Sequence, residues 1–398
     1  MKNHTFVRSD LVRGLGQGVL ETGFGVFIIL IAIRFWEAPD FYKAALAGGG
    51  SIGLVLTPFA MGFISRNKLP GSKKCMLLLV FVAAFVFAAS LSTTVLFFTI
   101  FLVFAQICLS QVPSLMIQIY SSVYKAGERG KKISFNLIAS TMGGLFSSFL
   151  FGTYLDTDEA DFRYVLWGMC IAALISSFAV WRMNYDSDSK EVNSSRESIF
   201  QSICNPLKDS LFVKILLAWM ILGFGAIMTF PLRIEYLSRE DQLNLSNQEI
   251  AFITVAIFFG AKVMSMYMWG KLFDRMHFMK FRILLNFQMM IAILIYFNST
   301  TFMGVIIGSL LAGSVMGGAN LAWNLWVTKL APAGREKDYM SVHMALTGLR
   351  GGAAPFAGYL LEENIGFDGV SYVSVCMILI SSILFATTLK EARLVAKS

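Results

Sequence analysis

Charged residues are scarce in this sequence. Of its 398 residues only 15% are Asp, Glu, Lys or Arg, whereas 56% are hydrophobic and the mean hydropathy is +0.65. This balance excludes an ordinary soluble domain, because a soluble surface carries more charge. Length alone would suggest two or three soluble domains. The composition instead predicts one all-α membrane protein with many spans.

Motifs for metal binding and for catalysis are also missing. The five cysteines are scattered and form no CxxC, so we expect neither a metal site nor a disulfide. The sequence has no Walker-type loop, no HExxH and no hydrolytic set, so we expect no ATP-driven pump, no enzyme and no cofactor. No short apolar segment with a cleavage site opens the chain, so we expect no signal peptide to be removed.

Long apolar segments are what the sequence does contain. A segment of about 20 apolar residues is long enough to cross the hydrocarbon layer. By that criterion the sequence predicts twelve spans, at about 14–35, 43–65, 75–93, 95–122, 134–155, 164–183, 212–232, 249–270, 281–298, 301–328, 341–361 and 371–389.

The basic residues are distributed unevenly around these spans. If the N-terminus is cytoplasmic, the cytoplasmic segments hold 26 of the 33 Lys and Arg residues and the outer loops hold 5. Lysine and arginine concentrate on the cytoplasmic side of membrane proteins, so both termini are predicted to be cytoplasmic. The formal net charge of +8 is therefore a topology signal, and we expect no nucleic-acid partner.

The longest polar stretch divides the chain into two halves. It predicts a six-helix bundle at 1–185, a cytoplasmic linker at 186–211 and a second six-helix bundle at 212–398. Residues 114–152 align with 320–358 without a gap, so that Gln118 falls on Asn324. The weak identities keep their order along the chain, which favours a duplicated 6+6 repeat with both halves in the same orientation.

The segment after the eighth predicted span carries a recognisable motif. It resembles the loop motif G-x-L-a-D-R-x-G-R-K of the major facilitator superfamily, and the matching residues are Gly270, Leu272, Asp274, Arg275 and Lys280. The glycine expected at position 277 is a histidine, and the first-half copy from Gly62 to Lys74 lacks the aspartate. The resemblance covers the whole chain as a topology and implies a pseudo-symmetric transporter fold.

The same resemblance implies a role for part of this loop. In the family the loop is similar to a latch that stabilises one access state, which would involve Gly270, Asp274 and Arg275. The alternative is a basic loop that only sets the topology. The antiporter motif of the family, a fifth span that ends in Gly-Pro, is absent here, which lowers the expectation of a drug/proton antiporter.

Three charged residues lie deep inside the predicted spans, away from the ends that adjoin the loops. Glu21 is the only carboxylate among them, and it is either a proton-coupling group or half of a fixed ion pair. Lys262 and Arg350 lie roughly 12–14 Å from the inner ends of their spans, given a rise of 1.5 Å per residue. Two cations against one carboxylate leave about one positive charge, which favours an anionic or polar solute unless Lys262 is neutral. Lys262 could instead snorkel to the inner surface.

Polar side chains accompany these charges. His343, Thr347 and Arg350 share one helix face, and His343, near the inner end, is expected at the membrane interface. The resemblance places the fourth and tenth spans around a central cavity. The amide side chains of both spans and the indole of Trp323 in the tenth therefore either bind the solute or form interhelical contacts. The predicted substrate-binding residues are Arg350, Lys262, Gln118, Asn320, Trp323 and Asn324.

These features predict a function. The chain is expected to be a monomeric secondary transporter that moves a small polar or anionic solute by alternating access, as a proton symporter, across the bacterial inner membrane. One alternative is a multidrug/proton exporter of the same fold. Another, from a different class, is a membrane sensor or assembly protein that keeps the scaffold without transporting.

Overall fold

The structure is a computed structural model that describes residues 2–66, 69–124, 126–183, 205–332, 335–391 and 393. Every regular element among these residues is helical. Most of the predicted linker, residues 186–204, lies outside the described residues. The chain forms two compact units, Met1–Val192 with Leu245–Val255, and Asn193–Asn244 with Ala256–Ser398.

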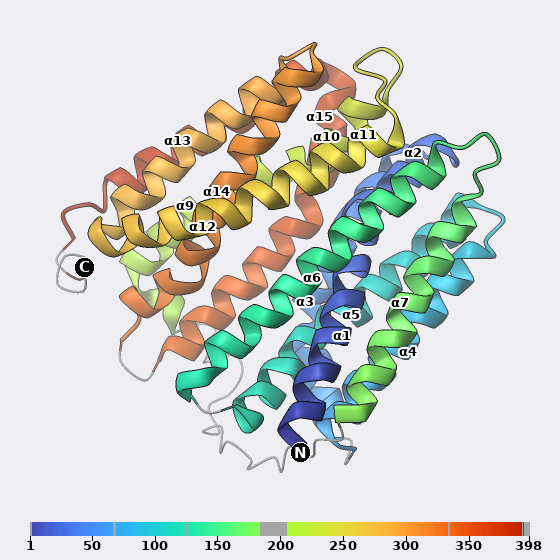
Figure 1. Ribbon diagram of the computed structural model, residues 1–398. Helices are drawn as coiled ribbons and strands as arrows, with labels where there is room; N and C mark the ends of the chain where they lie inside the picture. The colour runs from blue at the N-terminus through green and yellow to red at the C-terminus, as the bar shows by residue number, and fades with distance from the viewer. Residues whose placement is uncertain are drawn as a thin grey trace. The chain divides into compact units, whose positions relative to one another are not determined.

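The first unit contains the described helices of the first half and one short helix of the second (Figure 1). Its helices are α1 (Lys2–Thr22), α2 (Ile28–Arg34), α3 (Asp40–Arg66), α4 (Gly71–Ser90), α5 (Val95–Val123), α6 (Ala126–Leu155), α7 (Phe162–Met183) and the short α11 (Asn247–Ala251). A π-helical stretch (Gly23–Phe27) joins α1 to α2, and together they form a span over Thr5–Arg34. Helix α1 packs on α6 and α7, and α4 packs on α5 and α7.

Helix α11 is attached to the first unit by side chains that satisfy its first backbone N–H groups. Asp156, directly after α6, accepts hydrogen bonds from the backbone nitrogens of Asn247 (2.7 Å) and Gln248 (2.9 Å). Arg34 donates to Asn247 Oδ1 at 2.7 Å, and Ser246 forms a capping box with Glu249. A carboxylate is favourable at a helix N-terminus, where the dipole is positive.

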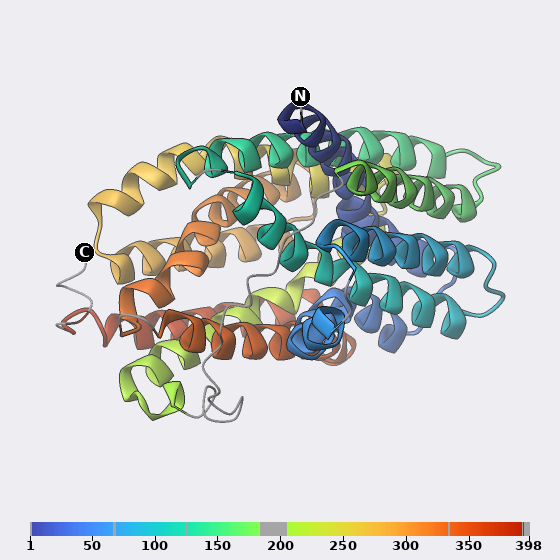
Figure 2. The same cartoon turned by 90° about the horizontal axis from the view of Figure 1, so that it is seen from below.

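The second unit is built from the remaining helices. They are α9 (Ser210–Ile227), α10 (Thr229–Ser238), α12 (Phe258–Arg275), α13 (Phe278–Phe297), α14 (Phe302–Leu330) and α15 (Glu336–Ala386). A 3₁₀ turn (Pro206–Lys208) precedes α9, and the boundary with the first unit falls within the π-helical stretch (Phe252–Ile257) that precedes α12. Helices α12, α13 and α14 run side by side in both views (Figures 1 and 2).

Proline and glycine explain two interruptions in this unit. Helix α9 ends at Ile227, four residues before Pro231, and proline has no N–H with which to bond that carbonyl. In α15 the backbone at Gly366 has φ +68° and ψ 177°, which breaks the helical geometry there. A positive φ of this kind is readily adopted only by glycine.

Ten of the helical segments in the described part of the chain are long and apolar enough to cross a membrane. One of them, Asp338–Ala386, contains the break at Gly366, and the 27-residue helix α3 is additional to the ten. Large apolar side chains face outward, for example Phe63, which is 79% exposed, and Met264, which is 83% exposed. Exposed apolar surface of this kind suits contact with lipid and not with water.

Candidate functional site

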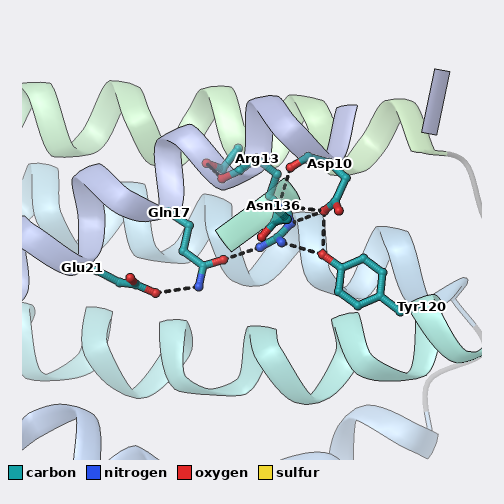
Figure 3. A network of polar contacts seen from close by, with 7 residues as sticks. Asp10, Arg13, Gln17, Glu21, Tyr120 and Asn136 are labelled. Atoms are coloured by element: carbon teal, nitrogen blue, oxygen red, sulfur yellow. Dashed lines mark hydrogen bonds and ion pairs between the residues drawn. The ribbon is translucent and has the colours of Figure 1, made fainter. Parts of the chain in front are cut away.

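A buried polar network joins three helices of the first unit (Figure 3). Asp10 of α1 accepts hydrogen bonds from Arg13 Nε at 3.0 Å, from Tyr120 Oη of α5 at 2.7 Å and from Asn136 Nδ2 of α6 at 3.1 Å. Arg13 also donates to Tyr120 Oη at 2.8 Å. Asp10 is 2% exposed and Arg13 4% exposed, so this ion pair is buried and its lone pairs and N–H groups find partners inside the unit.

Hydrogen bonds continue from this pair along α1 to Glu21. Arg13 donates through Nη1 to Gln17 Oε1, and Gln17 Nε2 donates to Glu21 Oε1 at 2.7 Å. Ser140 of α6 donates to the other carboxylate oxygen of Glu21 at 3.4 Å. Residues spaced by three or four lie on one face of a helix, so α1 presents one continuous polar face. Glu21 itself is exposed.

A cavity of about 240 Å³ lies beside this polar face. Its polar lining residues are Arg13, Gln17, Glu21, Gln106, Ser110 and Ser176, and its apolar ones include Leu20, Phe24 and Leu109. Gln106 is held in place, because its Nε2 donates to the Leu46 carbonyl (2.9 Å) and its Oε1 accepts from the Gly50 N–H (3.0 Å). The first unit therefore places a carboxylate, a guanidinium and two side-chain amides around one hollow.

Glu21 is not the only carboxylate in a membrane-spanning helix, so that interpretation of the sequence was wrong. The first span begins near Thr5 and not at 14, which brings Asp10 and Arg13 into the helix. A hydropathy window excludes charged residues, but a paired and hydrogen-bonded charge can be buried. Glu235 is likewise buried in α10, at 5% exposure. The polar residues at positions 10, 13, 17 and 21 are spaced by three or four and so share one helix face. This spacing could have predicted that the first helix begins before residue 14.

In the second unit, Arg350 lies against α9. Its Nη1 donates to the carbonyl oxygen of Trp219, and its guanidinium covers the backbone at Gly223, where any Cβ would overlap it. A side chain at position 223 would therefore have to displace the guanidinium from this place. Arg350 is half-buried, and no carboxylate pairs with it among the described residues.

His343, predicted at the membrane interface, is enclosed by protein and is not exposed there. Its side chain is fully buried and packs against three indoles, with ring-centre distances of 5.1 Å to Trp326, 5.4 Å to Trp323 and 6.1 Å to Trp219. Neither ring nitrogen has a hydrogen-bond partner in the described part of the chain. Residue depth alone suggested an interface, whereas packing between α9, α14 and α15 encloses the imidazole.

The other predicted substrate residues are only partly brought together. Trp323 joins the cluster around His343, and Asn320 is half-buried on the same helix, α14. The side chain of Asn324 lies outside the described residues. Lys262 is half-buried on α12 with its Nζ 5.4 Å from the Phe259 ring centre. Gln118 is exposed and does not line the 240 Å³ cavity, to which α5 instead contributes Gln106 and Ser110.

The predicted latch residues lie on a helix and not in a loop. Helix α12 continues to Arg275, so Gly270, Asp274 and Arg275 form its last turns. His277 then caps α13 by accepting a hydrogen bond from the Met279 N–H. Asp274 and Arg275 are both exposed, and Asp274 has no ion pair among the residues that the structure describes.

Solved structures with the same fold are transporters. A mutant form of the nucleoside transporter NupG superposes with a TM-score of 0.78 at 11% identity over 97% of this chain and 100% of that one. A D-xylose-proton symporter gives 0.73 at 14% over 98% of both chains. A bacterial homolog of the human lysosomal transporter Spinster gives 0.67 at 12% over 100% of this chain and 98% of that one.

Sequence comparison extends these likenesses. No curated protein matches the sequence. The family model of the Major Facilitator Superfamily matches residues 14–355 and 238–397, which together cover nearly all of the chain. The chain is thus an integral membrane protein with many spans, and it belongs to the major facilitator superfamily of transporters.

Proposed function

We propose that this protein is a proton-coupled secondary transporter of a small polar or anionic solute. It works by alternating access as a monomer in a bacterial inner membrane, with twelve spans and cytoplasmic termini. Two six-helix bundles at 1–185 and 212–398 are joined by the linker at 186–211. The excess of basic residues in the predicted inner segments, 26 against 5, supports this topology.

The proposed role of Glu21 in proton coupling rests on one observation, the hydrogen bonds that its carboxylate makes at the edge of the 240 Å³ cavity. Its carboxylate accepts hydrogen bonds from an amide at 2.7 Å and a hydroxyl at 3.4 Å, and it makes no ion pair among the described residues. A carboxylate held by neutral donors can gain a proton without separating an ion pair. Protonation of Glu21 would weaken the bond that its carboxylate accepts from Gln17. Gln17 Oε1 accepts a bond from Arg13, so the change would be passed along the polar face of α1.

The residues proposed to bind the solute are those that the sequence predicts. Arg350 supplies the charge for an anionic group, Lys262 a second cation, and Trp323 a surface for stacking. The amides at Gln118, Asn320 and Asn324 supply hydrogen bonds to hydroxyl or carbonyl groups. Gly270, Asp274 and Arg275 act as a latch for one access state. The names of the structural neighbours suggest nucleosides and D-xylose as first candidates, and another protein of this fold, the peptide transporter POT, suggests peptides.

The test begins with a thermal-shift screen of the purified protein against nucleosides, pentoses, peptides and organic anions. A binding solute is then offered to vesicles that contain the protein, with and without an imposed proton gradient. We expect gradient-driven accumulation in the native protein. Glu21→Gln should lose accumulation but retain exchange of solute across the membrane, because only the proton step needs a titrating group.

The matched control is Glu240→Gln, which makes the same change at an exposed position after α10. It should accumulate solute as the native protein does. If Glu21→Gln accumulates solute against its gradient at the native rate, Glu21 does not couple protons. If no vesicle moves a solute that binds in the screen, the transport proposal itself fails.

A further inference from the structure

Two arginines of the second unit meet at one tryptophan. Arg282 of α13 places its Cζ 4.7 Å from the ring centre of Trp219, on α9. Arg350 of α15 donates to the carbonyl oxygen of the same residue. Trp219 therefore contacts one guanidinium with its ring and the other with its backbone. The sequence did not single out Arg282, because it stands at the start of a predicted span and reads as part of the basic inner loop.

No described carboxylate neutralises either arginine. Arg282 is 4% exposed, and its Nε donates to Asn286 Oδ1 at 2.9 Å, while Asn286 donates to Ser382 Oγ at 2.9 Å. In the described residues neither guanidinium takes part in an ion pair. A buried cation such as Arg282 that lacks a counter-charge is strongly unfavourable, and the half-buried Arg350, on the same tryptophan, adds repulsion from a second cation.

Several hydrogen-bond donors at the same place are also unsatisfied. Nη1 of Arg282, Nε of Arg350 and Nε1 of Trp219 are buried and have no acceptor among the described residues. Both ring nitrogens of the buried His343, which packs on Trp219, also lack a hydrogen-bond partner among the described residues, and at least one of them is a donor. Buried donors are nearly always paired, so this group of them is a place for an acceptor, and the two cations beside them favour one with negative charge.

We propose that Arg282, Arg350 and Trp219 form an anion-binding site for a single small anion, either a free inorganic ion such as chloride or the carboxylate group of a solute. Guanidinium groups match such anions in geometry as well as charge, and apolar walls strengthen the attraction by excluding water. Arg282 is then a binding residue equal in importance to Arg350. Binding is independent of transport, and only the claim that the anion is carried across the membrane rests on the proposed function.

The test measures thermal unfolding of the full-length protein in detergent while chloride or acetate replaces a bulky sulfonate buffer anion at constant ionic strength. We expect the midpoint to rise by about 3 °C as the small anion saturates its site. A response to chloride alone supports a free inorganic ion as the occupant. A response to acetate at least as large supports the carboxylate of a solute.

Variants locate the response. Arg282→Gln and Arg350→Lys should each raise the half-saturating anion concentration about tenfold or more, since each removes one guanidinium fork. Arg182→Gln, at an exposed arginine at the end of α7, should leave it unchanged. If Arg282→Gln fails to fold, Arg282→Lys keeps the charge without the fork and should show the weaker binding.

Two results overturn the site. One is a native protein that responds equally to all three anions, and the other is a response that survives in both arginine variants. The transport proposal can fail separately. If vesicles move no solute while the purified protein still binds chloride or acetate, the transport proposal fails and the anion site stands. If the protein transports a neutral solute and shows no anion response, the anion site fails and the transport proposal stands.

Discussion

At the scale of single residues, the decisive feature is how the charges in the helices are satisfied. Asp10 has an arginine, a tyrosine and an asparagine around it, whereas Arg282 and Arg350 have no carboxylate in the described part of the chain. The first arrangement is complete and holds α1, α5 and α6 together. The second is incomplete without an anion. The same physical rule, that buried charge needs a partner, therefore indicates a scaffold in one unit and a ligand in the other.

The buried pair predicts a clear pattern of stability losses. Asp10→Leu leaves Arg13 as an unpaired buried cation and should cost roughly 3–5 kcal/mol of unfolding free energy. Tyr120→Phe removes a hydroxyl that bonds to both charged groups and should cost about 1.5–3 kcal/mol, less than the loss of Asp10 because the ion pair itself remains. The double variant Asp10→Leu with Arg13→Leu should be more stable than Asp10→Leu alone, because no charge remains buried. Thermal unfolding in detergent orders the three, and a double variant less stable than the single one would contradict the argument.

At the scale of the helices, close approach is controlled by glycine. A Cβ at Gly18 of α1 would overlap the backbone of Ser140 on α6, and one at Gly143 of α6 would overlap the backbone at Leu15. The two helices therefore touch through their backbones over this stretch. That contact brings Ser140 within hydrogen-bond distance of Glu21. Small residues have this use in membrane helices generally, because they permit close van der Waals packing.

A pair of glycine-to-alanine changes tests this packing. Gly18→Ala should lower the unfolding midpoint and weaken the Ser140 bond to Glu21, since α1 and α6 must separate to admit a methyl group. Gly260→Ala on α12 is the control, because nothing lies within 4 Å of a Cβ there. It should be neutral or stabilising by up to about 1 kcal/mol through helix propensity. Equal effects of the two changes would show that close approach at Gly18 does not matter.

At the scale of the whole molecule, contacts far apart in sequence hold each unit together. Asp209 caps α9, accepts hydrogen bonds from Arg393 (2.8 Å) and Tyr339 (3.0 Å), and so ties the end of the chain to both α9 and α15. Burial, the largest influence, would raise the pKa of Asp209. Bonds from Arg393, the Phe212 N–H and Tyr339 outweigh it and hold the pKa below its ordinary value of 3.8.

A lowered carboxyl pKa gives a definite dependence of stability on pH. The folded state then binds fewer protons than the unfolded state, so the stabilisation is complete above the unfolded pKa and is lost as pH falls through the lower folded value. We expect the thermal unfolding midpoint of the native protein to decrease as the pH is lowered through about 4, the range in which the unfolded carboxyl takes up its proton. Asp209→Asn should show a shallower fall. Curves that remain parallel over that range would exclude this contribution.

Composition and hydropathy were enough to predict a membrane protein built from helices, and the motif from Gly270 to Lys280 was enough to suggest the family. These features are local, since each depends on a run of neighbouring residues. The burial of Asp10, Arg13, Arg282 and His343 depended on partners more than 60 positions away, for example 126 from Asp10 to Asn136, and no hydropathy window along the chain includes them. Sequence therefore determined that the chain is helical and apolar enough to cross a membrane many times, and only the tertiary structure decided which charges are buried, because a charge is buried where its partners are and not where its neighbours are apolar.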